Sequence, residues 1–147
     1  MSESVTISTY GKIMIVDNDV IIHDCMRALL DDLFRVVTMH TALEGLECLE
    51  CLETDGPFDV VMSSFALQYS GMNGLEFLRR VGELSPVTLR ILMSGGCGDK
   101  VDIHQALREG HINRFVGKPF STTTLRELLK SDLRSIRVRI AHRRSSL

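Results

Sequence analysis

Five short apolar segments, each followed by residues with apolar side chains at helical spacing, constrain the fold most strongly. The predicted strands cover residues 12–16, 35–39, 58–62, 88–93 and 113–116. Alternation of short apolar strands with helices is typical of a parallel sheet covered by helices on both faces. We therefore predict an α/β fold with a doubly wound, five-stranded parallel sheet.

Signals for helix starts accompany four of the predicted helices. A side-chain oxygen that accepts a hydrogen bond from a backbone N–H stabilises the first turn of a helix, and a glutamate three residues later strengthens the signal. The pairs are Thr41 with Glu44, Asn73 with Glu76 and Thr124 with Glu127, and Asp99 is a further cap. The helix that starts at residue 41 is expected to continue to Leu52.

The length of 147 residues and the 44% hydrophobic content fit one globular domain. We expect residues 1–11 to form a flexible tail, residues 12–133 the domain, and residues 134–147 a basic helical extension or linker. No apolar run reaches the ~18 residues that span a membrane, and the first residues do not resemble a signal peptide. These observations predict a cytoplasmic protein.

Charge is divided unevenly along the chain. Residues 134–147 contain five arginines and no acidic residue, whereas the preceding residues are mildly acidic. Such a basic end can contact nucleic acid or an acidic partner, but a solvated helix end is the more common case. An apolar stripe with partly heptad-like spacing continues into it and predicts a homodimer through the last helix or a link to another domain. The stripe consists of Leu125, Leu129, Leu133, Ile136 and Ile140.

Four cysteines are present, and Cys48 and Cys51 form a C-x-x-C pair. A zinc site needs a second ligand pair at suitable spacing, and the sequence lacks one. The pair lies in a helical pattern, which favours packing positions over a redox pair.

Polar side chains follow several of the predicted strands. The carboxyl ends of parallel strands meet at one edge of a sheet, where α/β proteins bind ligands. We therefore expect a functional site at this edge. It comprises Asp17, Asn18, Asp19, Ser63, Ser64, Ser94 and Lys118.

Residues 12–133 resemble the CheY-like receiver domain of two-component response regulators. The resemblance rests on four stretches in order: KIMIVDND, GMNGLEFLRRV, RILMSG and INRFVGKPF. It implies a flavodoxin-like (βα)5 receiver fold and a role in phosphorelay signal transduction. LSPVTLRILMSG and ALREGHINRFVGKPF are also similar to receivers joined to HD-GYP domains, which hydrolyse cyclic di-GMP.

The resemblance assigns roles to residues at the strand ends, and two positions depart from the family pattern. The position of the phosphoacceptor aspartate holds Ser64. The acidic pair that helps bind magnesium becomes Asp17 and Asn18, with Asp19 in the next position. The resemblance further implies that Ser94 and Lys118 sense the phosphoryl group.

Phe115 lies at the family's switch aromatic, although a buried core aromatic has the same sequence pattern. The family's contact surface is the face formed by the fourth helix, the fifth strand and the last helix.

These departures change the expected chemistry. A serine hydroxyl is a weak nucleophile without an adjacent base, and Mg²⁺ prefers anionic oxygen ligands. We therefore predict a degenerate pseudo-receiver that acts through protein contacts, without phosphorylation and without catalytic residues. Mg²⁺ would bind at most weakly, at Asp17. The expected partner is a sensor kinase, an output domain or another signalling protein. The alternatives are a receiver phosphorylated at another residue and, less favoured, a nucleic-acid-binding module.

Overall fold

The computed structural model describes residues 10–50, 58–67, 71–95 and 103–145. Five parallel strands form one sheet in the order β2-β1-β3-β4-β5. The strands are β1 (Lys12–Val16), β2 (Arg35–Met39), β3 (Val60–Ser64), β4 (Leu89–Ser94) and β5 (Arg114–Gly117). The helices are α1 (Val20–Leu30), α2 (Ala42–Glu50), α3 (Gly74–Leu84), α4 (Ile103–Arg108) and α5 (Thr122–Ser145). The predicted doubly wound α/β fold is confirmed.

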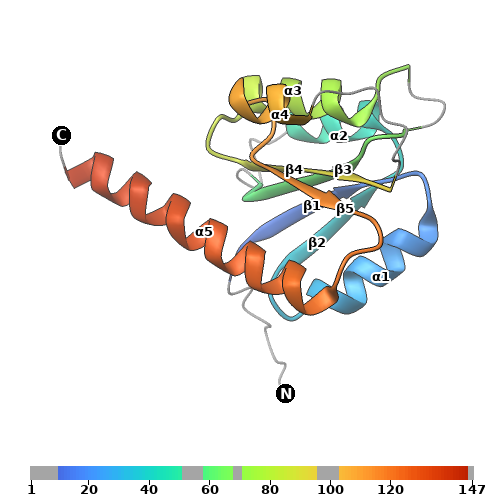
Figure 1. The fold of residues 1–147 in the computed structure, drawn as a ribbon, viewed down its shortest axis with the longest axis horizontal. Coiled ribbons are helices and arrows are strands. Elements are labelled where there is room, and N and C mark those ends of the chain that lie inside the picture. The colour runs from blue at the N-terminus through green and yellow to red at the C-terminus, as the bar shows by residue number, and fades with distance from the viewer. Residues whose placement is uncertain (1–9, 51–57, 68–70, 96–102, 146–147) are drawn as a thin grey trace.

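The helices cover the two faces of the sheet, as Figure 1 shows: α1 and α5 lie on one side, and α2, α3 and α4 on the other. Alternate residues of each strand point to opposite faces. Ile13 and Ile15 belong to the apolar cluster under α1 and α5, whereas Met14 and Val16 belong to the cluster under the other three helices. All four side chains are fully buried. The central strands are therefore apolar on both faces, which explains their continuous apolar runs.

Two of the predicted helix caps are confirmed. Thr41 Oγ1 accepts a hydrogen bond from the Glu44 N–H (3.1 Å), and Glu44 Oε1 accepts one from the Thr41 N–H (3.2 Å). Asn73 Oδ1 accepts one from the Glu76 N–H at 2.9 Å. Both caps have the geometry that their sequence spacing predicts.

The prediction for the start of α5 was wrong. The helix begins at Thr122, and the Oγ atom of Ser121 accepts the Thr124 N–H at 3.3 Å. Ser121 therefore occupies the capping position assigned to Thr124. Asp99 and Leu52 lie outside the described residues.

The predicted third strand was displaced by two residues. β3 runs from Val60 to Ser64, so both serines are strand residues rather than loop residues. Ser64 pairs with Met93 of β4 in the ladder. β3 extends through Ser63 and Ser64 because these residues pair with Leu92 and Met93 of β4. The change from apolar to hydroxyl side chains does not end the strand.

Ordered structure continues past both of the predicted domain boundaries, at residues 12 and 133. Tyr10, assigned to the tail, packs on the apolar cluster with its ring 6.0 Å from that of Phe34, and its N–H donates to the Leu33 carbonyl. At the other end, α5 continues as one helix through the predicted boundary to Ser145. Its last part projects beyond the sheet in Figure 1.

Candidate functional site

Three strands deliver one side chain each to the carboxyl edge of the sheet. Asp17 directly follows β1, Ser64 is the last residue of β3, and Lys118 directly follows β5. β1 and β3 are neighbours, and β5 is bonded to β4. The predicted convergence of these residues at one edge is what the parallel topology produces.

Asp17, Ser64 and Lys118 form one hydrogen-bonded cluster. The Ser64 hydroxyl donates to Asp17 Oδ2. Lys118 Nζ donates to Ser64 Oγ at 2.8 Å and lies 3.2 Å from Asp17 Oδ2. Asp17 and Ser64 are each 3% exposed. The serine oxygen therefore donates to an anion and accepts from a cation, in a place that water hardly reaches.

The remaining acidic-pocket residues have separate positions. The second oxygen of Asp17, Oδ1, accepts the Asp19 N–H at 2.8 Å. Asp19 is exposed, and its own carboxylate caps α1 by accepting the Ile21 N–H at 2.9 Å. Asn18 is partly exposed. Asp19 thus stabilises a helix start and does not supply the carboxylate that Asn18 lacks.

Ser94 and Phe115 lie on the adjacent strands β4 and β5. Ser94 ends β4 and is 8% exposed, and its carbonyl accepts the Lys118 N–H at 2.9 Å. Phe115 of β5 is 38% exposed. The exposure places this aromatic ring at the surface, not in the core.

His23 is a site neighbour that sequence reasoning missed. It is 5% exposed, and its Nε2 lies 2.6 Å from the Asp17 carbonyl oxygen. Because a carbonyl accepts only, Nε2 carries the proton. The His40 ring lies beside it, with 4.8 Å between centroids. The spacing from His23 to Met26 and Leu30, the other buried residues of α1, is the signal that places it on the inner face.

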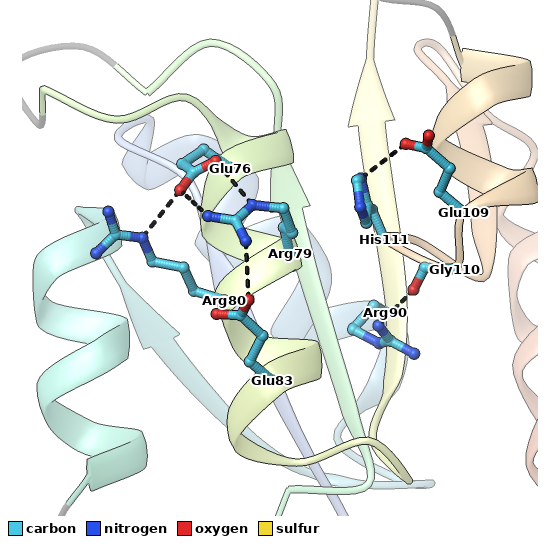
Figure 2. A network of polar contacts seen from close by, with 8 residues as sticks. All are labelled: Glu76, Arg79, Arg80, Glu83, Arg90, Glu109, Gly110 and His111. Carbon is cyan, nitrogen blue, oxygen red and sulfur yellow. Dashed lines mark hydrogen bonds and ion pairs between the residues drawn. The ribbon is translucent and has the colours of Figure 1, made fainter.

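Arg90 is a second buried polar residue that the sequence did not reveal. It is 8% exposed in β4, and Figure 2 shows its guanidinium reaching the Gly110 carbonyl. That bond measures 2.7 Å, and Nε donates to the Thr88 carbonyl at 3.2 Å. Burial lowers the pKa of the Arg90 guanidinium. The side chain ties the turn after α4 to the sheet, and it sits at the end opposite the cluster.

An ion-pair network covers the outer surface of α3. Figure 2 shows Glu76 between Arg79 and Arg80, and Arg79 reaching Glu83 as well. Hydrogen bonds from Arg79 and then Arg80 lower the pKa of Glu76 from its usual 4.5 to about 2. Such exposed networks contribute little to stability individually, and we assign this one no binding role.

The predictions about the cysteine pair, a metal cluster and a membrane span concern residues outside the carboxyl-edge cluster. Cys51 lies outside the described residues, so the prediction for the C-x-x-C pair stays untested. Within residues 10–50, 58–67, 71–95 and 103–145, no three metal-binding side chains gather. None of the helices in the same ranges is long and apolar enough to span a membrane.

The donor set at the edge does not fit Mg²⁺. This ion requires octahedral oxygen coordination, usually with one or two carboxylates. Asp17 is the one buried carboxylate of the cluster, and both of its oxygens already accept hydrogen bonds. Ser64 and Asn18 offer only neutral oxygens.

The strand order defines a flavodoxin-like α/β domain, and Asp17, Ser64 and Lys118 cluster at the carboxyl edge of its sheet. The model of the response regulator receiver domain matches residues 13–130. This chain belongs to the response regulator receiver domain family, as its sequence motifs predict.

Individual relatives agree with this assignment. The hydrogenase transcriptional regulatory protein HoxA of Cupriavidus necator is 32% identical over 110 residues, which are 75% of this chain and 21% of that protein. The chain thus spans about a fifth of the length of this relative.

Two solved structures are similar across most of the chain. The signal receiver domain of an HD domain-containing protein from Pseudomonas fluorescens Pf-5 has a TM-score of 0.77 and 26% identity, covering 95% of this chain and 98% of that one. It supports the predicted resemblance to HD-GYP-type receivers. The BeF3-activated DrrB receiver domain has a TM-score of 0.68 and 28% identity, covering 84% of this chain and 97% of that one.

Proposed function

We propose that this receiver domain regulates a protein partner by direct contact, without accepting a phosphoryl group. The observation that carries the proposal is the state of Ser64, which occupies the phosphoacceptor position. Its hydroxyl donates to Asp17 and accepts from Lys118. A receiver aspartate presents a free carboxylate oxygen to the phosphoryl donor, and this side chain has no such oxygen.

The neighbours of Ser64 do not make it a nucleophile. Lys118 forms an ion pair with Asp17, and an ammonium group has no lone pair with which to accept the serine proton. A carboxylate such as Asp17 is a weak base toward an alcohol. Ser64 is also 3% exposed, so a donor molecule would have to displace the cluster to reach it. Both the chemistry and the access oppose phosphorylation, and we assign the domain no enzyme activity.

We place the contact surface on the face formed by α4, β5 and α5. This face presents Leu107 and Phe115, each 38% exposed. Exposed apolar side chains on a folded domain are candidates for protein contacts. The partner in this proposal is a sensor kinase, an output domain or another signalling protein in the cytoplasm.

A second copy of the chain is a further candidate partner, through α5. The last buried residue described in this helix is Leu133, and the helix continues to Ser145. A projecting helix of this length is marginal on its own. The HoxA relative is named as a transcriptional regulator, but nucleic-acid binding by the arginines of this chain remains the weaker alternative.

The experiment is intact-mass spectrometry of the full chain after incubation with acetyl phosphate and Mg²⁺. We expect no adduct of +80 Da, the mass of a phosphoryl group (PO₃H), on the wild type. The Ser64→Asp variant provides the matched comparison, and Asn18→Asp with Ser64→Asp rebuilds both carboxylates. A labile adduct on the wild type that maps to Asp17 or Asp19 would show phosphorylation at another residue and would contradict the proposal.

A further inference from the structure

A buried carboxylate needs a counter-charge, and here the chain provides its own. Asp17 is 3% exposed, and Lys118 Nζ lies 3.2 Å from its Oδ2 atom. Removing one member of a buried ion pair is strongly destabilising, because the other charge is left without compensation. The Lys118 ammonium therefore neutralises Asp17 in the structure.

Each oxygen of Asp17 already has a hydrogen-bond donor. Oδ1 accepts the Asp19 N–H, Oδ2 accepts the Ser64 hydroxyl and the Lys118 ammonium, and the backbone carbonyl accepts His23 Nε2. A cation at this carboxylate would have to displace at least one of these donors. Mg²⁺ also loses hydration water reluctantly, so a single, fully engaged carboxylate offers it little.

We infer that Lys118 is a built-in counter-ion that replaces a divalent cation at Asp17. The Asp17–Ser64–Lys118 cluster then joins the carboxyl ends of β1, β3 and β5 in one arrangement that Mg²⁺ does not change. The inference rests on the proposed function, because both start from Ser64. It concerns cation binding, which is measured without a phosphoryl donor.

The backbone extends this arrangement to the contact face. The Lys118 N–H donates to the Ser94 carbonyl at 2.9 Å, so the end of β4 is tied to the same residue. Lys118 stands four residues before the first residue of α5. Lys118 therefore connects the buried Asp17 carboxylate to β5 and α5, which carry the proposed contact surface, and no ligand is needed for this connection.

Thermal unfolding of the full chain with and without Mg²⁺ tests the inference. We expect the Tm of the wild type to be unchanged by millimolar Mg²⁺. Lys118→Met leaves Asp17 without its counter-charge, so we expect its Tm to fall by roughly 5–10 °C and Mg²⁺ to restore part of the loss. Lys130→Met is the matched control, because Lys130 contacts Glu127 in a surface pair on α5.

Stability, cation binding and phosphorylation give distinguishable results. A Lys118→Met protein as stable as the wild type, or a wild type stabilised by Mg²⁺ as much as the variant, would overturn the inference. If Lys118→Met does not fold, binding of Mn²⁺ to the wild type, followed by electron paramagnetic resonance, decides instead. Saturable binding abolished by Asp17→Asn would overturn the inference, and absence of saturable binding would support it. A phosphoryl adduct without cation binding would instead contradict the proposed function alone.

Discussion

Lys118 Nζ lies 2.8 Å from Ser64 Oγ, so the side chain that follows β5 directly contacts the hydroxyl at the end of β3. Both groups also bond to Asp17. In this receiver domain a serine hydroxyl completes the hydrogen-bonded cluster between a carboxylate and a lysine. The cluster gives the buried Asp17 carboxylate a counter-charge from within the chain.

Removing the Ser64 hydroxyl should destabilise the fold. Ser64→Ala deletes one donor to the buried Asp17 carboxylate and one acceptor for Lys118, and leaves these two groups only their contact with each other within the cluster. We expect a loss of about 1–3 kcal/mol in the free energy of unfolding, measured by urea denaturation. Thr123→Ala, at an exposed position, should change it by less than about 0.5 kcal/mol. Equal losses in the two variants would show that the cluster does not stabilise the fold.

Gly82→Ala should have opposite effects in two backgrounds. A Cβ atom at this position would lie 2.1 Å from Arg90 Nη1, which is held by the Gly110 carbonyl. In the wild type we expect a loss of about 1–2 kcal/mol as the guanidinium is displaced. In an Arg90→Met background the substitution should stabilise α3 by up to about 1 kcal/mol through helix propensity. A double-mutant cycle in urea measures this coupling, and additive effects would exclude the contact.

Gly74→Ala should displace the backbone of Ser64, although Gly74 is not a member of the Asp17–Ser64–Lys118 cluster. A Cβ atom at Gly74, the first residue of α3, would lie 1.9 Å from the Ser64 carbonyl oxygen, which is backbone and cannot turn away. We expect a loss of at least about 2 kcal/mol and altered amide signals at Ser64 in NMR spectra. Gly110→Ala is a useful contrast. It meets no atom within 4 Å but has a φ of +76°, so its cost is conformational and remote from Ser64.

The ion pairs of Glu76 should make the thermal stability depend on pH below about 4.5. The folded pKa of about 2 lies below the usual 4.5, because the Arg79 and Arg80 side chains bond to the carboxylate. A lowered pKa contributes stability above the unfolded pKa, and this contribution is lost as the pH falls from about 4.5 toward 2. We expect Glu76→Gln to lower the Tm near neutral pH and to match the wild type near pH 2. A Tm difference that does not change with pH would contradict this assignment.

The alternating pattern predicted most of the fold because the central strands are apolar on both faces and the helices carry apolar stripes. It also predicted which residues meet, since parallel strands bring Asp17, Ser64 and Lys118 to one edge. The three-residue spacing between Thr41 and Glu44, and between Asn73 and Glu76, also predicted the two helix caps. These features follow from the order and spacing of residues along the sequence.

The details that failed depend on contacts between distant residues. β3 extends to Ser64 because its backbone pairs with Met93, which composition does not reveal. The burial of Arg90 follows from carbonyls at Thr88 and Gly110. His23 is held by the Asp17 carbonyl, and its identity as a polar residue concealed its place on the inner face. Side-chain partners of this kind are set by tertiary packing.

NMR spectra with and without beryllofluoride and Mg²⁺ test the central claim most directly, because the BeF3-activated DrrB receiver shows that this ligand acts on a receiver with a related structure. We expect the ¹H–¹⁵N spectrum of the wild type to stay unchanged. The Asn18→Asp, Ser64→Asp variant should show shifts at Ser94, Phe115 and Lys118. Shifts of these amides in the wild type would show that the site accepts a phosphoryl group mimic, and they would contradict a phosphorylation-independent receiver.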